Sequence, residues 1–320
     1  MNPNLAKFTT PGRIVFRDAS PAPVAVLVSP YGSAEVSLYG AHVLSCRPTG
    51  HAPLLWLAES YKTLQPGKAI RGGIPVCWPW FGAAGKEGLP SHGFARTQVW
   101  SVISTEFDKD STSVTFGLVS TPETKALWPH DFKLELTVTV GPAFKVELAT
   151  TNIGDAPFEI TEALHTYFRV KNVADASVTG LDGQPYIDKA PGGANAVQSG
   201  AVTFSGETDR VYNHHATAAI ISDPGIGRRI AIEKEGSQAT VVWNPWIEKA
   251  ARLADMADDD WPHFVCVETA NAGAAPVAVA PGARHVLSAS ITAVLLDKDG
   301  NPVKGRDPSD NAGHEGARTR

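Results

Sequence analysis

Cysteine is scarce in this 320-residue sequence, and its three thiols, Cys46, Cys77 and Cys266, are scattered along the chain. An odd and scattered set is typical of reduced thiols in a cytosolic protein, and it argues against a disulfide framework. The metal-binding spacings CxxC and HExxH are both missing from the sequence. We therefore expect neither disulfides nor a metal site.

The sequence also lacks long apolar runs, an excess of basic residues and an apolar leader. A membrane-spanning helix needs about 20 apolar residues, and the apolar runs here are interrupted sooner. The net charge is −5, whereas nucleic-acid binding needs a clustered basic surface. The opening MNPNLAKFTT has no signal-peptide core. We expect a cytoplasmic protein with neither nucleic acid nor membrane as a partner.

Turn residues are abundant, with 29 glycines and 24 prolines. They separate about sixteen segments of alternating apolar residues, such as 132–140 (FKLELTVTV) and 143–151 (AFKVELATT). Only residues 248–257 (EKAARLADMA) predict a helix. Because helices do not alternate with strands, the pattern predicts an all-β antiparallel sandwich and excludes a parallel βαβ fold.

Composition is even from residue 14 to residue 296, which favours one β-sandwich domain over residues 1–296. Residues 297–320 are charged, glycine-rich and nearly free of apolar side chains. Such a composition predicts a mobile polar tail.

Two strand segments carry candidate acid–base residues. In residues 158–170 (FEITEALHTYFRV), His165 shares a strand face with Tyr167 and Arg169, and an imidazole titrates near neutral pH. In residues 263–271 (HFVCVETAN), Glu268 ends an apolar strand, where burial raises a carboxyl pKa. The alternative for each residue is a solvated group on an exposed sheet.

Two loops carry candidate anion-binding residues. Residues 70–82 (IRGGIPVCWPWFG) hold Arg71 among glycines, prolines and indoles, and residues 89–100 (LPSHGFARTQVW) hold His92 and Arg96. Fixed arginines suit a carboxylate or phosphate. The alternative is a loop that fills the core and leaves Arg71 solvated. Asp209, beside Arg210, suits either a ligand or a structural ion pair.

Six strings occur in the order of a known family: RGGIPVCWPWFG, SHGFAR, TEALHTYFRV, TDRVY, VVWNPW and VCVETAN. Together they resemble the D-hexose-6-phosphate mutarotases, or glucose-6-phosphate 1-epimerases, of the aldose 1-epimerase group. The resemblance covers roughly residues 14 to 296 and implies a galactose-mutarotase-like β-supersandwich. It implies an isomerase that exchanges the α and β anomers of hexose 6-phosphates, glucose 6-phosphate first among these small phosphosugars, without a cofactor, and we expect a monomer.

The resemblance also implies a role for each matching residue. His165 would be the general acid and Glu268 the general base, lining one groove several ångströms apart. Where the family often has a glutamine, this chain has a serine, whose shorter side chain would reach the sugar through water. The implied substrate-binding residues are Arg71, Ser91, His92, Arg96 and Asp209.

Three other functions remain to be compared with this one. A mutarotase for free aldoses would not need Arg71 and Arg96 at one spot. A non-catalytic carbohydrate-binding protein would use tryptophans as stacking platforms and would need no acid–base pair. A glycosidase normally needs two carboxylates flanking the bond, whereas this sequence offers one carboxylate and one histidine. The tryptophans in question are Trp78, Trp80, Trp243 and Trp246.

Overall fold

The computed structural model describes residues 3–65, 67–213, 215–274, 276–297 and 299–303. This part of the chain forms 23 strands, three short α-helices and four 3-10 helices. The strands pair antiparallel in three sheets and one two-stranded ribbon. The predicted all-β antiparallel sandwich is therefore confirmed.

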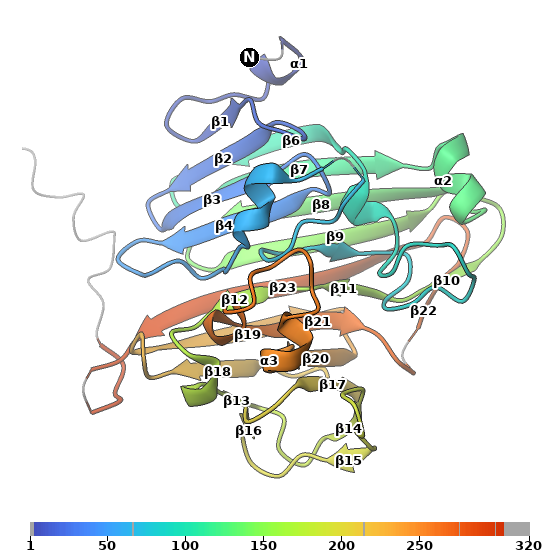
Figure 1. Cartoon of the computed structure of the whole chain (residues 1–320). Helices are drawn as coiled ribbons and strands as arrows, with labels where there is room; N and C mark the ends of the chain where they lie inside the picture. Colours follow the sequence, from blue (N-terminus) through green and yellow to red (C-terminus); the bar gives the residue numbers. More distant parts are fainter. Residues whose placement is uncertain (1–2, 66, 214, 275, 298, 304–320) are drawn as a thin grey trace, which may run out of the picture.

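The first sheet is N-terminal, has the order β1-β2-β3-β4 and lies beside β6 to β9 of a larger sheet (Figure 1). Its strands are β1 (Ile14–Arg17), β2 (Val24–Ser29), β3 (Gly32–Ser37) and β4 (His42–Pro48). The larger sheet has nine strands in the order β16-β13-β18-β19-β23-β9-β8-β7-β6. These are β6 (Ser101–Phe107), β7 (Thr112–Val119), β8 (Phe132–Val140), β9 (Phe144–Asn152), β13 (Ser177–Thr179), β16 (Val202–Thr203), β18 (Ala219–Asp223), β19 (Arg228–Glu235) and β23 (Arg284–Leu295).

The third sheet has eight strands in the order β15-β14-β17-β20-β21-β11-β5, with β12 also paired to β21. Its strands are β5 (Val76–Cys77), β11 (Glu162–Leu164), β12 (Tyr167–Arg169), β14 (Pro185–Asp188), β15 (Ala196–Val197), β17 (Thr208–Asn213), β20 (Ala239–Asn244) and β21 (Phe264–Asn271). The ribbon joins β10 (Phe158–Ile160) to β22 (Val277–Val279). The helices are α1 (Pro3–Ala6), α2 (Pro122–Leu127), α3 (Trp246–Ala250), η1 (Glu59–Thr63), η2 (Ala95–Thr97), η3 (Val173–Asp175) and η4 (Trp261–His263).

Alternation of apolar residues sets the two faces of each strand. In β8, every second side chain is buried along the whole strand, as its FKLELTVTV pattern predicts. In β21, Val265 and Val267 belong to the main core, whereas Phe264 and Cys266 belong to a separate cluster. Glu268 has the same parity as Phe264 and Cys266, so it lies on the face of the eight-stranded sheet turned away from the main core.

Two local predictions are wrong in extent. The helix predicted over residues 248–257 is α3, which starts earlier and ends at Ala250. Beyond it the chain forms turns, because the Asp255 carbonyl accepts a hydrogen bond from Ser60 and its carboxylate pairs with Arg71. The single strand predicted over residues 158–170 is divided into β10, β11 and β12.

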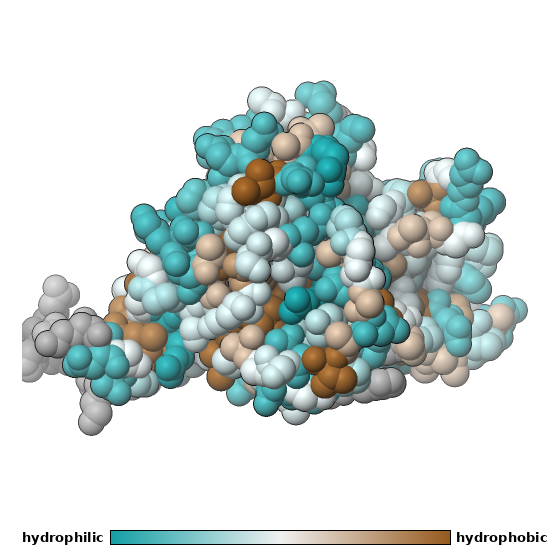
Figure 2. Space-filling view, turned by 60° about the horizontal axis from the view of Figure 1, so that its bottom comes forward, coloured by the Kyte–Doolittle hydropathy of each residue, from teal (hydrophilic) through white to brown (hydrophobic). Residues whose placement is uncertain are grey.

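Hydrophilic residues dominate the face seen in Figure 2, and hydrophobic residues appear there in separate small groups. None of the helices in the described residues is long and apolar enough to cross a bilayer. All three cysteines are free and buried. The predicted tail begins with a turn in which Asp297 accepts hydrogen bonds from Asp299 and Asn301, and residues 304–320 lie outside the described residues. The domain boundary at residue 296 stays a prediction.

A glycine holds the loop that carries two candidate site residues. Gly93 has φ +72°, and an added Cβ would lie 1.9 Å from the Trp78 carbonyl oxygen. At Gly282 φ is +75° but the space is open. We expect Gly282→Ala to cost about 1–2 kcal/mol from backbone strain and Gly93→Ala to cost about 3–5 kcal/mol, because strain and clash add. Chemical denaturation measures both, and equal losses would contradict the clash.

Candidate active site

His165 and Glu268 meet on the eight-stranded sheet. The His165 and Tyr167 amides donate to the carbonyls of Pro75 and Gly73, at 3.0 and 2.9 Å, so the chain leaves β11 and follows the loop before β5. This break brings the imidazole Nε2 to 3.4 Å from Oε1 of Glu268. Glu268 is 1% exposed and His165 8% exposed. The two groups are closer than the several ångströms expected. The cause is the pairing of β11 with β21, which places the residue that follows β11 beside Glu268.

A pocket of about 350 Å³ surrounds this pair and is called the catalytic pocket here. Five of the seven predicted residues line it: Arg71, His92, His165, Asp209 and Glu268. Ser91 and Arg96 are not among its lining residues. Residues from five separate parts of the sequence thus reach one site.

Burial sets the proton distribution of the pair. The pKa of His165 is lowered by burial, then by the neighbouring His92 imidazole and by the charges of Arg71 and Arg96. The pKa of Glu268 is raised by burial and by Asp209. Neutral imidazole with a carboxylic acid is therefore favoured in the free site. That form and the ionised pair contain the same number of protons and differ only in whether one proton lies on Nε2 or on Oε1, atoms that are 3.4 Å apart.

His92 presents a hydrogen-bond donor to the pocket. Its Nδ1 accepts the Gly82 amide at 3.2 Å, and burial lowers its pKa to about 3. The ring is therefore neutral near pH 7 and carries its proton on Nε2. A neutral donor of this kind suits a sugar oxygen.

Arg71 and Arg96 meet in a second pocket of about 530 Å³, which we call the arginine compartment. Its cationic lining residues are Lys68, Arg71, Arg96 and Arg252. Arg71 lines both pockets and donates to the Tyr167 hydroxyl at 2.9 Å and to Asp255 Oδ2 at 2.8 Å. The two predicted arginines therefore share one space, next to the catalytic pocket.

Ser91 acts on this compartment through its backbone. Its carbonyl accepts Nη2 of Arg96 at 2.7 Å, while its hydroxyl donates to the Gly82 carbonyl at 3.2 Å. The side chain is exposed and lines neither pocket. Ser91 thus orients Arg96 in this structure.

Asp209, on β17, is held by a lysine that the sequence did not reveal. Lys249 Nζ lies 3.7 Å from Asp209 Oδ2 and 2.6 Å from Glu207 Oε1. Burial raises the pKa of Asp209, and Lys249 opposes that effect. The lysine thus favours an ionised Asp209, a form that acts only as a hydrogen-bond acceptor.

The tryptophans do not form the platform that a binding module needs. Trp243 lines the catalytic pocket, but Trp78 is fully buried and donates to Thr150 at 3.0 Å. Trp80 donates to the Pro90 carbonyl, and Trp246 packs against Trp261. Trp78 therefore cannot serve as a stacking platform, because its ring fills the core.

Several site residues carried no recognisable signal in the sequence. Lys189 and Lys249 look like ordinary surface lysines, and Asp255 falls in the predicted helix. Tyr167 did carry a signal, because its parity matched that of His165. Its ring stacks on the His165 ring, with centroids 4.9 Å apart and planes 10° apart.

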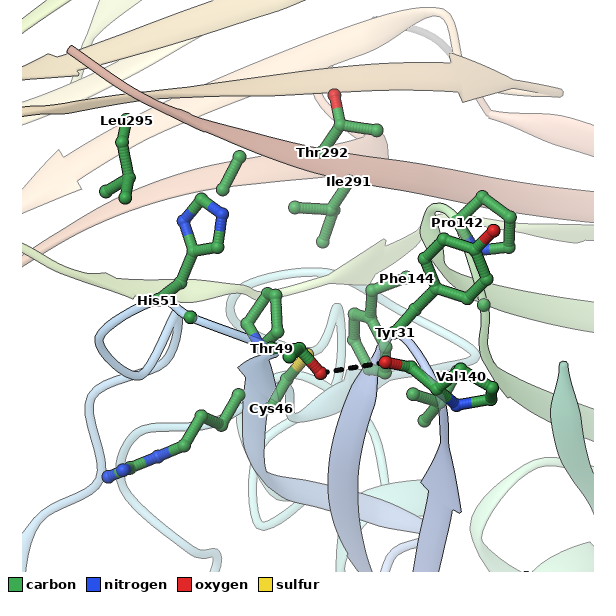
Figure 3. Close-up of a pocket in the computed structure, with 16 residues that line it drawn as sticks. Tyr31, Cys46, Thr49, His51, Val140, Pro142, Phe144, Ile291, Thr292 and Leu295 are labelled. Atoms are coloured by element: carbon green, nitrogen blue, oxygen red, sulfur yellow. Dashed lines mark hydrogen bonds between the residues drawn. The ribbon is translucent and has the colours of Figure 1, made fainter. Parts of the chain in front are cut away.

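A larger pocket of about 590 Å³ lies elsewhere, between β4 and β23 (Figure 3). It is lined by His51, Tyr31 and mainly apolar side chains. None of its described lining residues is a carboxylate. It therefore offers no acid–base pair of the kind found in the catalytic pocket.

Comparison with known proteins identifies the family of this chain. A sequence model of the family described as aldose 1-epimerase matches residues 24–292. The chain belongs to the aldose 1-epimerase family. This confirms the resemblance seen in the sequence and makes the protein an isomerase of the epimerase, or mutarotase, kind.

Relatives of this aldose 1-epimerase family member include a provisionally named glucose-6-phosphate 1-epimerase of Escherichia coli (strain K12). It is 42% identical over 248 residues, which are 77% of this chain and 82% of that protein. A Salmonella typhimurium crystal structure, provisionally described as a mutarotase, has TM-score 0.83 and 36% identity over 89% of this chain and 95% of that chain. A galactose mutarotase related enzyme of Lactobacillus acidophilus shares the fold, with TM-score 0.68 and 15% identity over 88% of this chain and 100% of that chain.

Lys189 gives this epimerase a testable pH dependence. Its charge lowers the pKa of Glu268, against the larger effect of burial. Removing a nearby positive charge stabilises every more protonated form of the His165–Glu268 pair, so both limbs of the pH–rate profile should move to higher pH. We expect this shift to be small for Lys189→Met, because the side chain is exposed, and to shrink with added salt. Lys189→Arg keeps the charge and should restore the profile; an unmoved Lys189→Met profile would contradict the prediction.

Proposed function

We propose that this enzyme interconverts the α and β anomers of hexose 6-phosphates, with glucose 6-phosphate as the first substrate to test. The observation that carries the proposal is the His165–Glu268 pair, 3.4 Å apart, in a pocket adjoining the arginine compartment. The names of the relatives from Escherichia coli and Salmonella typhimurium support the same reaction.

The proposed chemistry needs one base that acts on O1 of the sugar and one acid that acts on O5, two oxygens bonded to the same carbon. Glu268 takes the proton of the anomeric hydroxyl O1 while His165 gives a proton to the ring oxygen O5. The C1–O5 bond breaks and the C1–O1 double bond forms. Because O1 and O5 are both bonded to C1, a closely spaced pair can reach both atoms.

After ring opening, the protons on Glu268 and His165 are distributed in the way that burial of the two residues favours. The carboxyl group of Glu268 is then protonated and the His165 imidazole is neutral, which are the forms stabilised by the shifts in their pKa. Rotation about C1–C2 presents the other face of the aldehyde, and the reverse transfers close the ring. Each positioned proton transfer typically contributes about 10²–10⁴ in rate.

The remaining residues fit the rest of the substrate. Arg71 and Arg96 would hold the phosphate through charge-assisted hydrogen bonds, while Asp209 and His92 would bind sugar oxygens as acceptor and donor. Ser91 would contribute by orienting Arg96. We further propose that the enzyme acts as a cytoplasmic monomer, in keeping with its free thiols.

A substrate comparison tests the proposal. We expect magnetisation-exchange NMR to give a kcat/KM for glucose 6-phosphate about tenfold to a hundredfold above that for glucose, because the phosphate adds at least one charged hydrogen bond. Glucose 1-phosphate is the control, since its blocked O1 prevents ring opening. A preference for free glucose would overturn the phosphosugar assignment.

A mutarotase for free aldoses is the second candidate. The observation that favours it is that both terminal nitrogens of Arg71 already have partners, Tyr167 and Asp255. In that case the arginines would be structural. The same substrate comparison decides between the two.

A further inference from the structure

The two pockets adjoin each other and share lining residues. Arg71 and Leu253 are the described residues that line both of them. The catalytic pocket holds the acid–base pair, and the arginine compartment, at about 530 Å³, has more volume than one phosphate group needs. An oxyanion therefore has a place to bind even when no bond joins it to the sugar.

The contacts of Arg71 describe an anion position. Asp255 Oδ2 accepts from Nη2 at 2.8 Å, so a carboxylate already pairs with the guanidinium. Asp255 Oδ1 and Arg71 Nε are buried, and neither has a hydrogen-bond partner among the described residues. An entering oxyanion can use the free Nε–H of Arg71 together with Arg96.

The other contact of Arg71 leads to the general acid. Its Nη1 donates to the Tyr167 hydroxyl at 2.9 Å. The Tyr167 ring lies parallel to the His165 ring at 4.9 Å. Arg71 is thus linked to His165, the proposed acid, through Tyr167: by one hydrogen bond and one ring contact.

We propose that the arginine compartment binds a phosphate-type oxyanion as a ligand separable from the sugar, and that its occupation activates His165. The inference rests on the proposed function, since it assumes anomer exchange at His165 and Glu268. It adds that the phosphate group assists the chemistry as well as anchoring the substrate. Inorganic phosphite and free glucose should then act together as a substrate in two pieces.

The charges around the pair supply the physical reason. The groups facing His165 are Glu268 from β21, Tyr167 from β12, Arg71 and His92 from the two loops, Arg96 from η2 and the uncharged Trp243 from β20. After burial and the effect of His92, the charges of Arg71 and Arg96 lower the pKa of His165. A dianion beside Arg71 cancels that effect and favours the imidazolium.

Glu268 responds less to the same anion. The charges that shift its pKa, after burial, are those of Asp209, Lys189 and Arg96. Both arginines lower the pKa of His165, whereas Arg96 is the one of the two whose charge lowers the pKa of Glu268. An anion at Arg71 therefore moves the shared proton towards His165, which is the distribution that ring opening requires.

The test follows anomer exchange of free glucose while phosphite dianion is titrated at constant ionic strength. Because the anion favours the protonated form of His165, we expect kcat/KM for glucose to rise about tenfold, which corresponds to about 1.4 kcal/mol, and to saturate. The rate with Glu268→Gln measures catalysis by phosphite itself. With glucose 6-phosphate as substrate, phosphite should only compete.

Three variants locate the effect. Arg71→Ala should abolish activation. Tyr167→Phe keeps the ring stacked on His165 but loses the hydrogen bond to Arg71, so it should lower the maximal activation more than the affinity for phosphite. Arg47→Ala is the matched control, because Arg47 lines the larger pocket at β4 and its loss should leave activation unchanged.

The possible failures are distinguishable. If phosphite competes with glucose 6-phosphate but leaves glucose exchange flat, the site binds anions without activating His165, and the inference falls while the proposed function stands. If phosphite neither competes nor activates, the separable site is wrong. If the wild-type enzyme does not prefer glucose 6-phosphate to glucose, the proposed function itself fails.

Discussion

Glu268→Gln should reduce anomer exchange of glucose 6-phosphate by about 10²–10⁴-fold, the usual contribution of a positioned base. Glutamine keeps the size of the side chain but cannot take the O1 proton. The position is 1% exposed, and Nε2 of His165 lies 3.4 Å from the carboxylate. Magnetisation-exchange NMR measures the loss directly, after subtraction of the spontaneous rate in water.

His165→Asn should give a loss of similar size, because it removes the acid from the same proton relay. The double variant should be little worse than either single one, since groups that act as a unit are strongly non-additive. The unfolding transition of each variant provides the control for structural damage. Near wild-type exchange in either folded single variant would refute the acid–base assignment.

Arg71→Ala should lower kcat/KM for glucose 6-phosphate by about one to two decades, because a hydrogen bond to a charged group contributes roughly 1.5–3 kcal/mol. Free glucose has no phosphate contact to lose, so its kcat/KM should not fall; because the Arg71 charge lowers the pKa of His165, removing that charge should raise kcat/KM instead. Arg96→Ala should act in the same direction, since Arg96 shares the compartment with Arg71. Added salt should weaken wild-type use of glucose 6-phosphate, because it screens part of the attraction.

The ratio of kcat/KM for glucose 6-phosphate to kcat/KM for glucose decides whether Arg71 binds phosphate. If Arg71→Ala lowered kcat/KM equally for glucose and glucose 6-phosphate, the arginine would act by holding Tyr167 and Asp255 rather than phosphate. Arg71→Lys is the matched variant: it keeps the charge but loses the second terminal nitrogen of the guanidinium. Its kcat/KM for glucose 6-phosphate should lie between those of the wild type and Arg71→Ala.

Local patterns in the sequence determined the strands well. The alternation in residues 132–140 matches β8 at both ends, and that in residues 143–151 falls within one residue of β9. Such strands have one buried and one exposed face, so apolar and polar residues alternate along the sequence with a period of two. The helix predicted over residues 248–257 failed because tertiary contacts of Asp255 and Ser60 outweigh a weak local propensity.

The sequence also determined the chemical identity of the pair. Parity placed His165 beside Tyr167, which agrees with the structure. Glu268 was predicted to end its strand, but it lies inside β21, where it is 1% exposed. Only the tertiary structure decided how close the two groups come, because β11 and β21 are neighbours in the sheet but far apart in the chain. The break at His165 that turns the imidazole to Glu268 depends on the carbonyl of Pro75, which no local pattern reveals.

The same distinction explains the arginines and lysines. The sequence supplied Arg71 and Arg96 as candidates, but their meeting in one compartment depends on how two loops fold against each other. Lys189 follows β14 and Lys249 lies in α3, and neither had a signal, because lysines in such positions are common on any surface. Their role arises from the carboxylates that the sheet places opposite them, and charge–charge effects depend on distance in space rather than along the chain.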